Sequence, residues 1–430
     1  MDLRVSIAAL LALSSPAAAQ DAHQHMHGAP AAPAQETPVD HRDHGSGGAL
    51  GAYPMAREAS GTSWQPDASE HGGVHARVGD WTFMGHALLN GVLTTQGGPR
   101  GDDDAFIAGM IMGAARRDFA NGDTLNLRAM LSPDPFMGAD GYPLLFAAGE
   151  TGDGVTTLVD RQHPHDLFVE LSASYAHRLS VRDSVFVYAG LPGEPAFGPP
   201  VFMHRLSGMD SPEAPITHHW LDSTHVTFGV LTAGYVHVGF KIEASRFRGR
   251  EPDEHRYDVE TGDLDSTSVR LSWNPTPNWA LQASWAEIRS PEALEPDEDE
   301  TRTSVSAIYT RAIGAEGWLS VTGAAALKER SDGASLDAWL LEGALRPNPR
   351  WTIFARLEHL ETDELGLAPH GPAERVTRAS LGAVRDWRVA EHAALGFGLQ
   401  GSLALPSDGL SPSYDGDQAG GMAFVRLRID

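Results

Sequence analysis

Two short tracts near the N-terminus concentrate side chains that bind metal ions. HQHMH spans residues 23–27 and DHRDH spans residues 40–44. Imidazole nitrogen and thioether sulfur suit copper in either oxidation state, and suit zinc and nickel less selectively. A solvated linker of biased composition is the alternative, but this clustering favours metal binding. The candidate ligands are His23, His25, Met26, His27, His41 and His44.

Further histidines gather in two later segments, DRQHPHD at 160–166 and the stretch 200–225. One interpretation is a metal or substrate site, formed where a long connection folds inward. The other is a structural plug whose histidines hydrogen-bond one another and nearby carboxylates. No HExxH pattern fixes a geometry, so both interpretations stay open. The candidate ligands here are His163, His165, His204, His218, His219 and His225.

Enzymatic signatures do not accompany these histidines. The chain lacks GxSxG and a Walker loop, and a Ser-His-Asp set could be assembled only by choosing freely among many serines. We therefore expect no enzyme activity and name no catalytic residue. A lipid-active barrel enzyme is the least favoured alternative.

Charge and cysteine content exclude several protein classes. Asp and Glu number 57 against 32 Lys and Arg, which gives a net charge of -25, and cysteine is absent. Phosphate contacts need clustered Lys and Arg, so nucleic acid is not an expected partner. A disulfide scaffold and a thiolate metal site are impossible.

The N-terminal residues have the pattern of a secretory signal. Residues 1–19 combine Arg4, an apolar stretch and an alanine-rich cleavage site, which predicts a cleaved signal peptide. Residues 20–78 are rich in Ala, Pro, Gly and His without a sustained period, which predicts a disordered periplasmic leader. Residues 79–430 remain for the folded part.

From residue 80 onward, apolar and polar residues alternate in segments longer than most soluble strands. In 266–273, for example, Val269 and Leu271 alternate with Arg270. This pattern predicts an all-β fold, a transmembrane antiparallel β-barrel of about 16 strands (14 to 18), with short turns and long connections in alternation. The expected strands are 80–93, 104–116, 123–132, 166–179, 182–190, 223–236, 240–250, 264–274, 278–289, 301–312, 317–329, 334–346, 350–361, 374–386, 390–404 and 420–430.

Arginines fall on the polar faces of these segments. We expect them to point into the barrel and to pair with carboxylates there, which would make a polar interior. The arginines concerned are Arg178, Arg246, Arg270, Arg356, Arg378, Arg426 and Arg428.

Six motifs in the barrel part of the sequence are distinctive: DRQHPHDLF (160–168), YAGLPGEPAFGPP (188–200), MHRLSGMDSPEAP (203–215), THHWLDSTH (217–225), FRGREPDE (247–254) and NPTPNWALQ (274–282). They resemble a family of proteobacterial outer-membrane β-barrels that occur beside copper-resistance systems, and the leader resembles the His/Met-rich N-terminus of copper resistance protein B. The resemblance implies an outer-membrane location in a Gram-negative bacterium and a link to metal tolerance, without a mechanism.

The leading hypothesis is therefore an outer-membrane barrel that binds or passes copper-type ions. Its expected cofactors are copper ions, and its expected partners are outer-membrane lipids and lipopolysaccharide, the barrel assembly machinery and periplasmic copper proteins. Both ends of the barrel chain are expected in the periplasm. The rival hypothesis is a general porin or structural barrel without metal specificity.

The leader hypothesis makes a direct prediction. The purified mature protein should bind several equivalents of Cu(I) or Cu(II), and deletion of residues 21–44 should remove most of them, because that segment holds all six leader ligands. Equilibrium dialysis with metal analysis measures both stoichiometries. An unchanged stoichiometry would exclude a metal-binding role for the leader.

Overall fold

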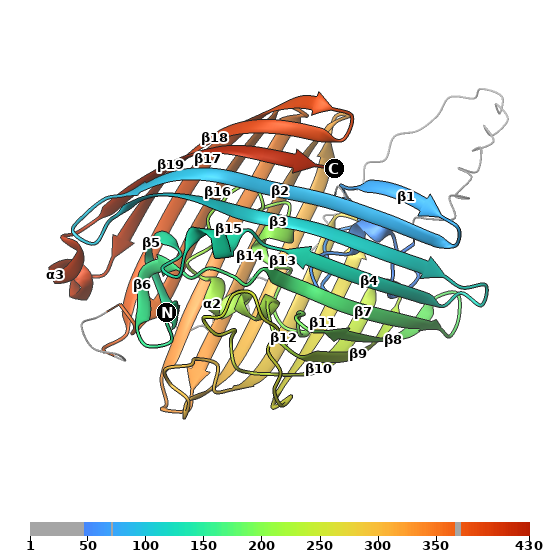
Figure 1. Ribbon diagram of the computed structural model, residues 1–430, viewed down its shortest axis with the longest axis horizontal. Helices are drawn as coiled ribbons and strands as arrows, with labels where there is room; N and C mark the ends of the chain where they lie inside the picture. The colour runs from blue at the N-terminus through green and yellow to red at the C-terminus, as the bar shows by residue number, and fades with distance from the viewer. Residues whose placement is uncertain (1–46, 70–71, 366–370) are drawn as a thin grey trace, which may run out of the picture. The chain divides into compact units, whose positions relative to one another are not determined.

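The computed structural model describes residues 47–69, 72–365 and 371–430. Within these residues, sixteen antiparallel strands form a closed barrel (Figure 1). Each barrel strand pairs with the next one along the chain, and pairing of the last strand with the first closes the ring. The predicted all-β antiparallel barrel of about sixteen strands is confirmed.

All sixteen barrel strands overlap the ranges expected from the alternation. The largest difference is at the sixth, which begins at Val230 rather than at residue 223, because residues 223–225 form a short helix instead. The barrel strands are β2 (Trp81–Gln96), β3 (Asp103–Asp118), β4 (Thr124–Leu131), β7 (Phe168–Arg178), β8 (Asp183–Gly190), β9 (Val230–His237), β10 (Phe240–Phe247), β11 (Ser266–Thr276), β12 (Trp279–Arg289), β13 (Asp299–Ile313), β14 (Gly317–Arg330), β15 (Ser335–Asn348), β16 (Trp351–Thr362), β17 (Glu374–Ala390), β18 (Ala393–Pro406) and β19 (Gln418–Ile429).

The remaining elements are short and lie in the connections or beside the wall. Strand β1 (Val74–Val78) forms a hairpin with β2, and β5 (Tyr142–Thr151) pairs with β6 (Thr157–Gln162) in a separate two-stranded sheet. The helices are η1 (Met55–Arg57), η2 (Asp134–Met137), η3 (Phe202–His204), α2 (His218–Leu221), η4 (Ser223–His225), η5 (Asp408–Leu410) and α3 (Ser411–Tyr414). Among the described residues, no helix is long and apolar enough to cross a membrane.

The outer face of the wall is apolar because alternate residues of each strand point outward. In β18, Leu395, Phe397 and Leu399 are exposed, whereas the residues between them face inward. Tryptophans are exposed next to the short turns, as at Trp279 and Trp351. An apolar band with aromatic residues at its edge is the outer surface that transmembrane β-barrels have.

The inner face is polar and is held together by buried ion pairs. In β10, Lys241 and Glu243 are both buried and their charged atoms lie 2.8 Å apart. Arg270 of β11 bonds to the same Glu243 at 2.9 Å. Buried charges are tolerated when they are paired in this way.

The prediction of inward arginines holds for the buried Arg270, Arg356, Arg378 and Arg426, while Arg428 is half-buried. It was wrong for Arg178 and Arg246, which are exposed. Each of these two lies at or near the end of its strand, and their guanidinium groups bond instead to Ser180 O and to Leu264 O and Thr267.

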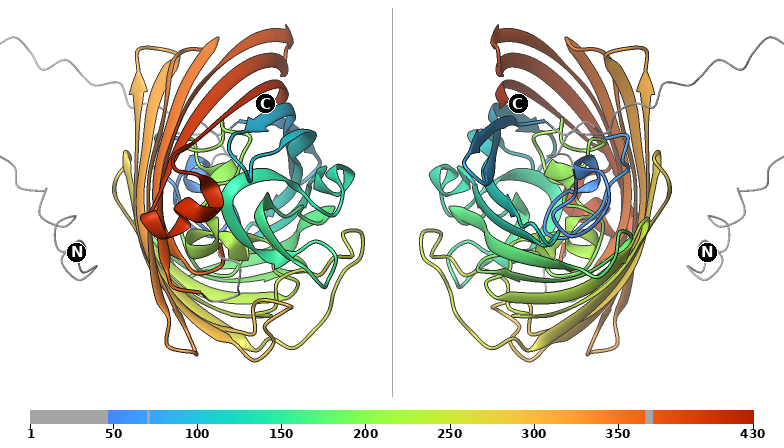
Figure 2. Two further views of the ribbon diagram at one scale, coloured as in Figure 1. Left: turned by 90° about the vertical axis from the view of Figure 1, so that its left-hand side faces the viewer. Right: turned by 90° about the vertical axis from the view of Figure 1, so that its right-hand side faces the viewer.

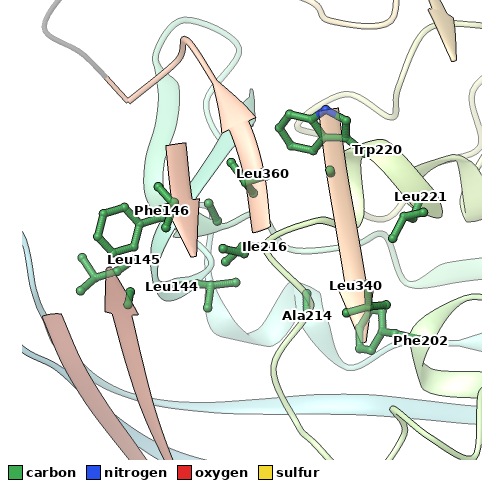
Figure 3. Packing of buried hydrophobic residues seen from close by; sticks show 14 of the residues in the cluster. Leu144, Leu145, Phe146, Phe202, Ala214, Ile216, Trp220, Leu221, Leu340 and Leu360 are labelled. Atoms are coloured by element: carbon green, nitrogen blue, oxygen red, sulfur yellow. The ribbon is translucent and has the colours of Figure 1, made fainter. Parts of the chain in front are cut away.

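The long connection 191–229 runs inside the ring of strands (Figure 2). Its side chains Phe202, Trp220 and Leu221 are buried in one cluster with Leu340 and Leu360 of the wall, as Figure 3 shows. Each fully buried large apolar side chain stabilises the fold by about 1.5–3 kcal/mol relative to exposure. The connection is thus packed against the wall as part of the core.

Ion pairs fix the same connection to several strands of the wall. Arg205 contacts Glu342 of β15 at 2.8 Å and Asp222 of its own connection at 2.6 Å, and all three side chains are buried. Further along, Glu213 contacts Arg378 of β17 at 2.7 Å and Asp210 contacts Arg426 of β19 at 2.5 Å. Because these pairs reach separate strands, the connection has one defined position.

Residues 47–69 were expected to belong to a leader without a core, and this expectation was wrong. Leu50, Tyr53 and Trp64 form a buried cluster with Phe186 and Val236 of the wall. The segment lies at the short-turn end, where Ala68 N–H bonds to Pro277 O. Its few aromatic and aliphatic side chains are enough to pack because the barrel supplies the other half of the core.

The connection's ionic anchor gives a stability prediction. Arg205→Met should lower the free energy of unfolding by about 3 kcal/mol or more, because it removes the guanidinium group that pairs with the buried carboxylates of Asp222 and Glu342. Arg289→Met is the matched control, since Arg289 is half exposed in its pairs with Glu287 and Asp299 and such pairs contribute about 0–1 kcal/mol. Urea unfolding in detergent measures both, and equal losses would contradict the role given to Arg205.

Candidate metal centre

Five of the six loop histidines predicted as ligands meet inside the barrel. His163 and His165 directly follow β6, and the others come from α2 and η4 of the connection 191–229. The two segments are brought together because both connections fold into the lumen. The five residues are His163, His165, His218, His219 and His225.

Three of these imidazoles form a compact group, which we call the three-histidine group. Each of His165, His218 and His225 offers one ligand atom, and these atoms all lie within 4.8 Å of one another. The ring of His225 has its centroid 4.9 Å from that of His165 and 5.1 Å from that of His218. All three side chains are buried, with exposed fractions of 8%, 1% and 4% in chain order.

Each ring of the three-histidine group is oriented through its Nδ1. His165 Nδ1 lies 2.7 Å from Asp134 Oδ2, and His218 Nδ1 lies 2.6 Å from Asp222 Oδ1. His225 Nδ1 lies 2.9 Å from the carbonyl oxygen of Asp222. Because carboxylates and carbonyls only accept hydrogen bonds, each Nδ1 carries the proton and donates it.

The other nitrogen of each ring, Nε2, is therefore unprotonated and carries a lone pair. His165 Nε2, His218 Nε2 and His225 Nε2 are buried and have no hydrogen-bond partner. Such atoms are rare in folded proteins, and each one needs an explanation. Imidazoles whose Nδ1–H is held by a carboxylate or carbonyl, with Nε2 directed at a common point, are the arrangement found around bound metal ions.

The protonation states agree with this role. Burial lowers the pKa of His218, although Asp222 opposes the shift, and burial with the neighbouring His165 lowers the pKa of His225 well below its usual value. Both rings are therefore neutral at neutral pH, the form that binds metals. Burial alone would raise the pKa of Asp222, but the charge of Arg205 outweighs it and the pKa lies well below the usual range.

A second group of three ligands adjoins the first, and we call it the Glu150 group. Glu150, His163 and His219 again place one ligand atom each within 4.8 Å of the others. His163 Nε2 lies 3.1 Å from Glu150 Oε1, and both side chains are buried. Burial lowers the pKa of His163 and of His219 well below the usual value, so these rings are also neutral.

His204 does not join either group. Its Nε2 lies 3.3 Å from the sulfur of Met130, and its ring faces that of His86. It lies instead beside a buried cluster in which Met110, Met112 and Met130 pack together. The leader residues His23, His25, Met26, His27, His41 and His44 lie outside the described residues.

Sequence reasoning missed Glu150 and Asp134. Neither has a signal in its own segment, because Glu150 follows a run of apolar residues and Asp134 stands 31 positions before the ring that it holds. Asp222 had a usable signal, since it follows His218 by four residues, one helical turn. A further trio, Asp253, Glu254 and His255, lies together at the surface.

Comparison with known proteins bears on the fold. No protein-family model matches the chain, and no curated protein matches it. Among solved structures, OmpF of Salmonella typhi in complex with daunomycin aligns with a TM-score of 0.50 at 10% identity, covering 82% of this chain and 100% of that one. The chain has the fold of a porin.

Two other solved structures are similar at lower scores. The anion-selective porin from Comamonas acidovorans has a TM-score of 0.48 at 10% identity and covers 81% of this chain and 100% of its own. OmpT of Vibrio cholerae has a TM-score of 0.47 at 10% identity, with 82% and 99% covered. None of these names refers to copper.

The lowered pKa of His225 predicts how stability depends on pH. Below the ordinary pKa of 6.5 the unfolded chain binds a proton at His225 that the folded chain does not, so the free energy of unfolding falls on acidification, by at most about 1.4 kcal/mol per pH unit from this group. His225→Gln should therefore lose less stability than the wild type between neutral pH and mild acid. Urea titrations with a chelator present measure this, and parallel curves would contradict it.

Proposed function

We propose that the protein is an outer-membrane β-barrel that binds a transition-metal ion inside its lumen, in the service of metal tolerance or passage. The observation that carries the proposal is the three-histidine group, in which three buried Nε2 atoms have no hydrogen-bond partner and the ligand atoms of the three imidazoles lie within 4.8 Å of one another. A neutral imidazole without a partner costs free energy in a folded core. A metal ion would supply the missing partner to all three at once.

The location follows from the surface of the barrel. Apolar side chains cover the outside of the wall and exposed tryptophans lie next to the short turns. Only a hydrocarbon environment makes such a surface favourable over a whole barrel. The porin fold supports the same location, and lipids of the outer membrane are then its immediate surroundings.

The ligand set limits the kind of ion. Imidazole nitrogen suits copper, zinc, nickel and iron, whereas calcium and magnesium prefer oxygen ligands. Three protein nitrogens also leave a coordination position for water or an exchangeable ligand. Copper is the ion we propose within this class, on the resemblance of the sequence motifs and on the leader ligands His23 to His27.

The arrangement favours controlled binding over free diffusion. The connection 191–229 is packed inside the ring, and its buried ion pairs reach β15, β17 and β19. An ion in the lumen therefore meets side chains that are held in place. Asp222 links this packing to the site, since it contacts both Arg205 and His218.

A general porin without metal specificity is the second candidate. It is favoured by the fold shared with OmpF of Salmonella typhi. Conductance in planar bilayers distinguishes the two, because a general porin passes simple salts irrespective of copper. In a metal-binding barrel, Cu²⁺ or Zn²⁺ bound at the three-histidine group should change the measured current.

The metal-binding proposal predicts the effect of single substitutions. Asp222→Asn should weaken the binding of Co²⁺ to the mature protein by about 10- to 100-fold, because it removes the carboxylate that orients His218. His225→Ala should remove the part of the visible absorption that comes from Co²⁺ at the three-histidine group. Titration followed by absorbance measures both.

The control is His237→Ala. His237 also contacts an aspartate, Asp183, at 2.8 Å, but it is half exposed beside a short turn and belongs to neither ligand group. Its Co²⁺ spectrum should match the wild type. Identical spectra for the wild type and His225→Ala would exclude a metal ion at the three-histidine group.

A further inference from the structure

The Glu150 group is built like a second metal site and touches the first one. We propose that it holds a second transition-metal ion, so that the lumen contains a two-ion centre in which an oxygen- and nitrogen-lined position lies beside an all-nitrogen one. The inference rests on the proposed function, because it extends the three-histidine group by a neighbouring site. The two sites nevertheless have separate ligands.

The two ligand groups are joined by adjacent residues. His163 and His165 are two positions apart in the chain and their ring centroids lie 5.4 Å apart, while the neighbours His218 and His219 have centroids 5.7 Å apart. In each pair, one ring belongs to each group. Ions bound in the two groups would therefore be close neighbours.

The backbone conformation at Gly149 and Glu150 brings the carboxylate ligand close to the histidines. Glu150 has a φ of 59°, in the left-handed region that non-glycine residues rarely adopt. The preceding Gly149 has a φ of 108°, and a Cβ atom there would lie 3.3 Å from Cε1 of His219. The chain thus approaches His219 closely and then turns the Glu150 carboxylate towards His163.

The charges around Glu150 provide an independent observation. Its carboxyl group lies beside that of Glu251, which comes from the connection between β10 and β11. Oε2 of Glu251 is buried and has no hydrogen-bond partner. Two neighbouring carboxyl groups repel each other when both are charged, and a bound cation relieves that repulsion.

Two basic side chains near this position pair with other carboxylates, although Nε of Arg256 is buried without a hydrogen-bond partner. Arg256 lies 3.3 Å from Asp166, and Lys328 lies 3.3 Å from Glu364 and 3.6 Å from Glu300. Glu292 adds a further buried carboxyl group next to Glu251 and Glu364. The carboxyl groups of Glu150, Glu251, Glu292 and Glu364 come from the long connections, at the end of the barrel opposite to the short turns.

The ligand chemistry of the two positions differs. One carboxylate and two imidazoles suit divalent ions of borderline softness such as Zn²⁺ and Cu²⁺. Three imidazoles hold the same ions without an anionic ligand. The two positions therefore differ in charge, because only the Glu150 group contributes an anionic ligand.

Electron paramagnetic resonance of the mature protein loaded with Cu²⁺ tests the two-ion centre. Two neighbouring Cu²⁺ ions couple magnetically, which gives a half-field signal and reduces the ordinary one. Leader-bound copper is common to all variants and cancels in difference spectra. We expect the coupled signal in the wild type, and its replacement by an uncoupled, nitrogen-coordinated signal in Glu150→Gln and His163→Ala.

Glu150→Gln keeps the size of the side chain, so it guards against the misfolding that His163→Ala could cause. His237→Ala is the control and should keep the coupled signal. A wild type that shows only an uncoupled nitrogen-coordinated signal, lost in His225→Ala, would overturn the second ion and leave the proposed function intact. If Glu150→Gln, His163→Ala and His225→Ala all kept the complete copper signal of the wild type, both the second ion and the proposed function would be overturned.

Discussion

The contact of Arg205 with Asp222 and Glu342 is the interaction on which the interior depends. Arg205 has no exposed side-chain surface, and it joins a wall strand to the residue that orients His218. A buried guanidinium is costly to desolvate, so it stays only where carboxylates surround it. The wall, the connection 191–229 and the three-histidine group are consequently parts of one charge-balanced unit.

The same constraint explains why the histidines can lack partners. A flexible connection would relax until each Nε2 found a hydrogen-bond acceptor or water. Here Asp222 and Asp134 fix two of the rings through Nδ1, and Asp222 is itself held by Arg205. Orientation is thus imposed from outside the ring cluster, which is how metal sites keep their ligands ready for an ion.

Most of the wall could be predicted from sequence because a strand's inner and outer faces alternate at a fixed period. The alternation of the apolar Val269 and Leu271 with the charged Arg270 is enough to predict a strand there and to say which of its faces points inward. The site depends on contacts between distant segments, such as Asp134 with His165, that no local period records. Residues 47–69 were misjudged for a related reason, since Trp64 and Tyr53 become core only against strands that follow them.

That N-terminal segment also constrains how the protein can assemble. The seam that closes the ring joins β2 with β19, the first and last strands of the barrel, and pairing strands so far apart in sequence carries a large loop-closure entropy. Residues 47–69 immediately precede β1 and β2, and they pack against Phe186 and Val236 inside the ring. The closed ring therefore encloses chain that precedes its own first strand, so the lumen must accommodate residues 47–69 in any state in which the β2–β19 seam is formed.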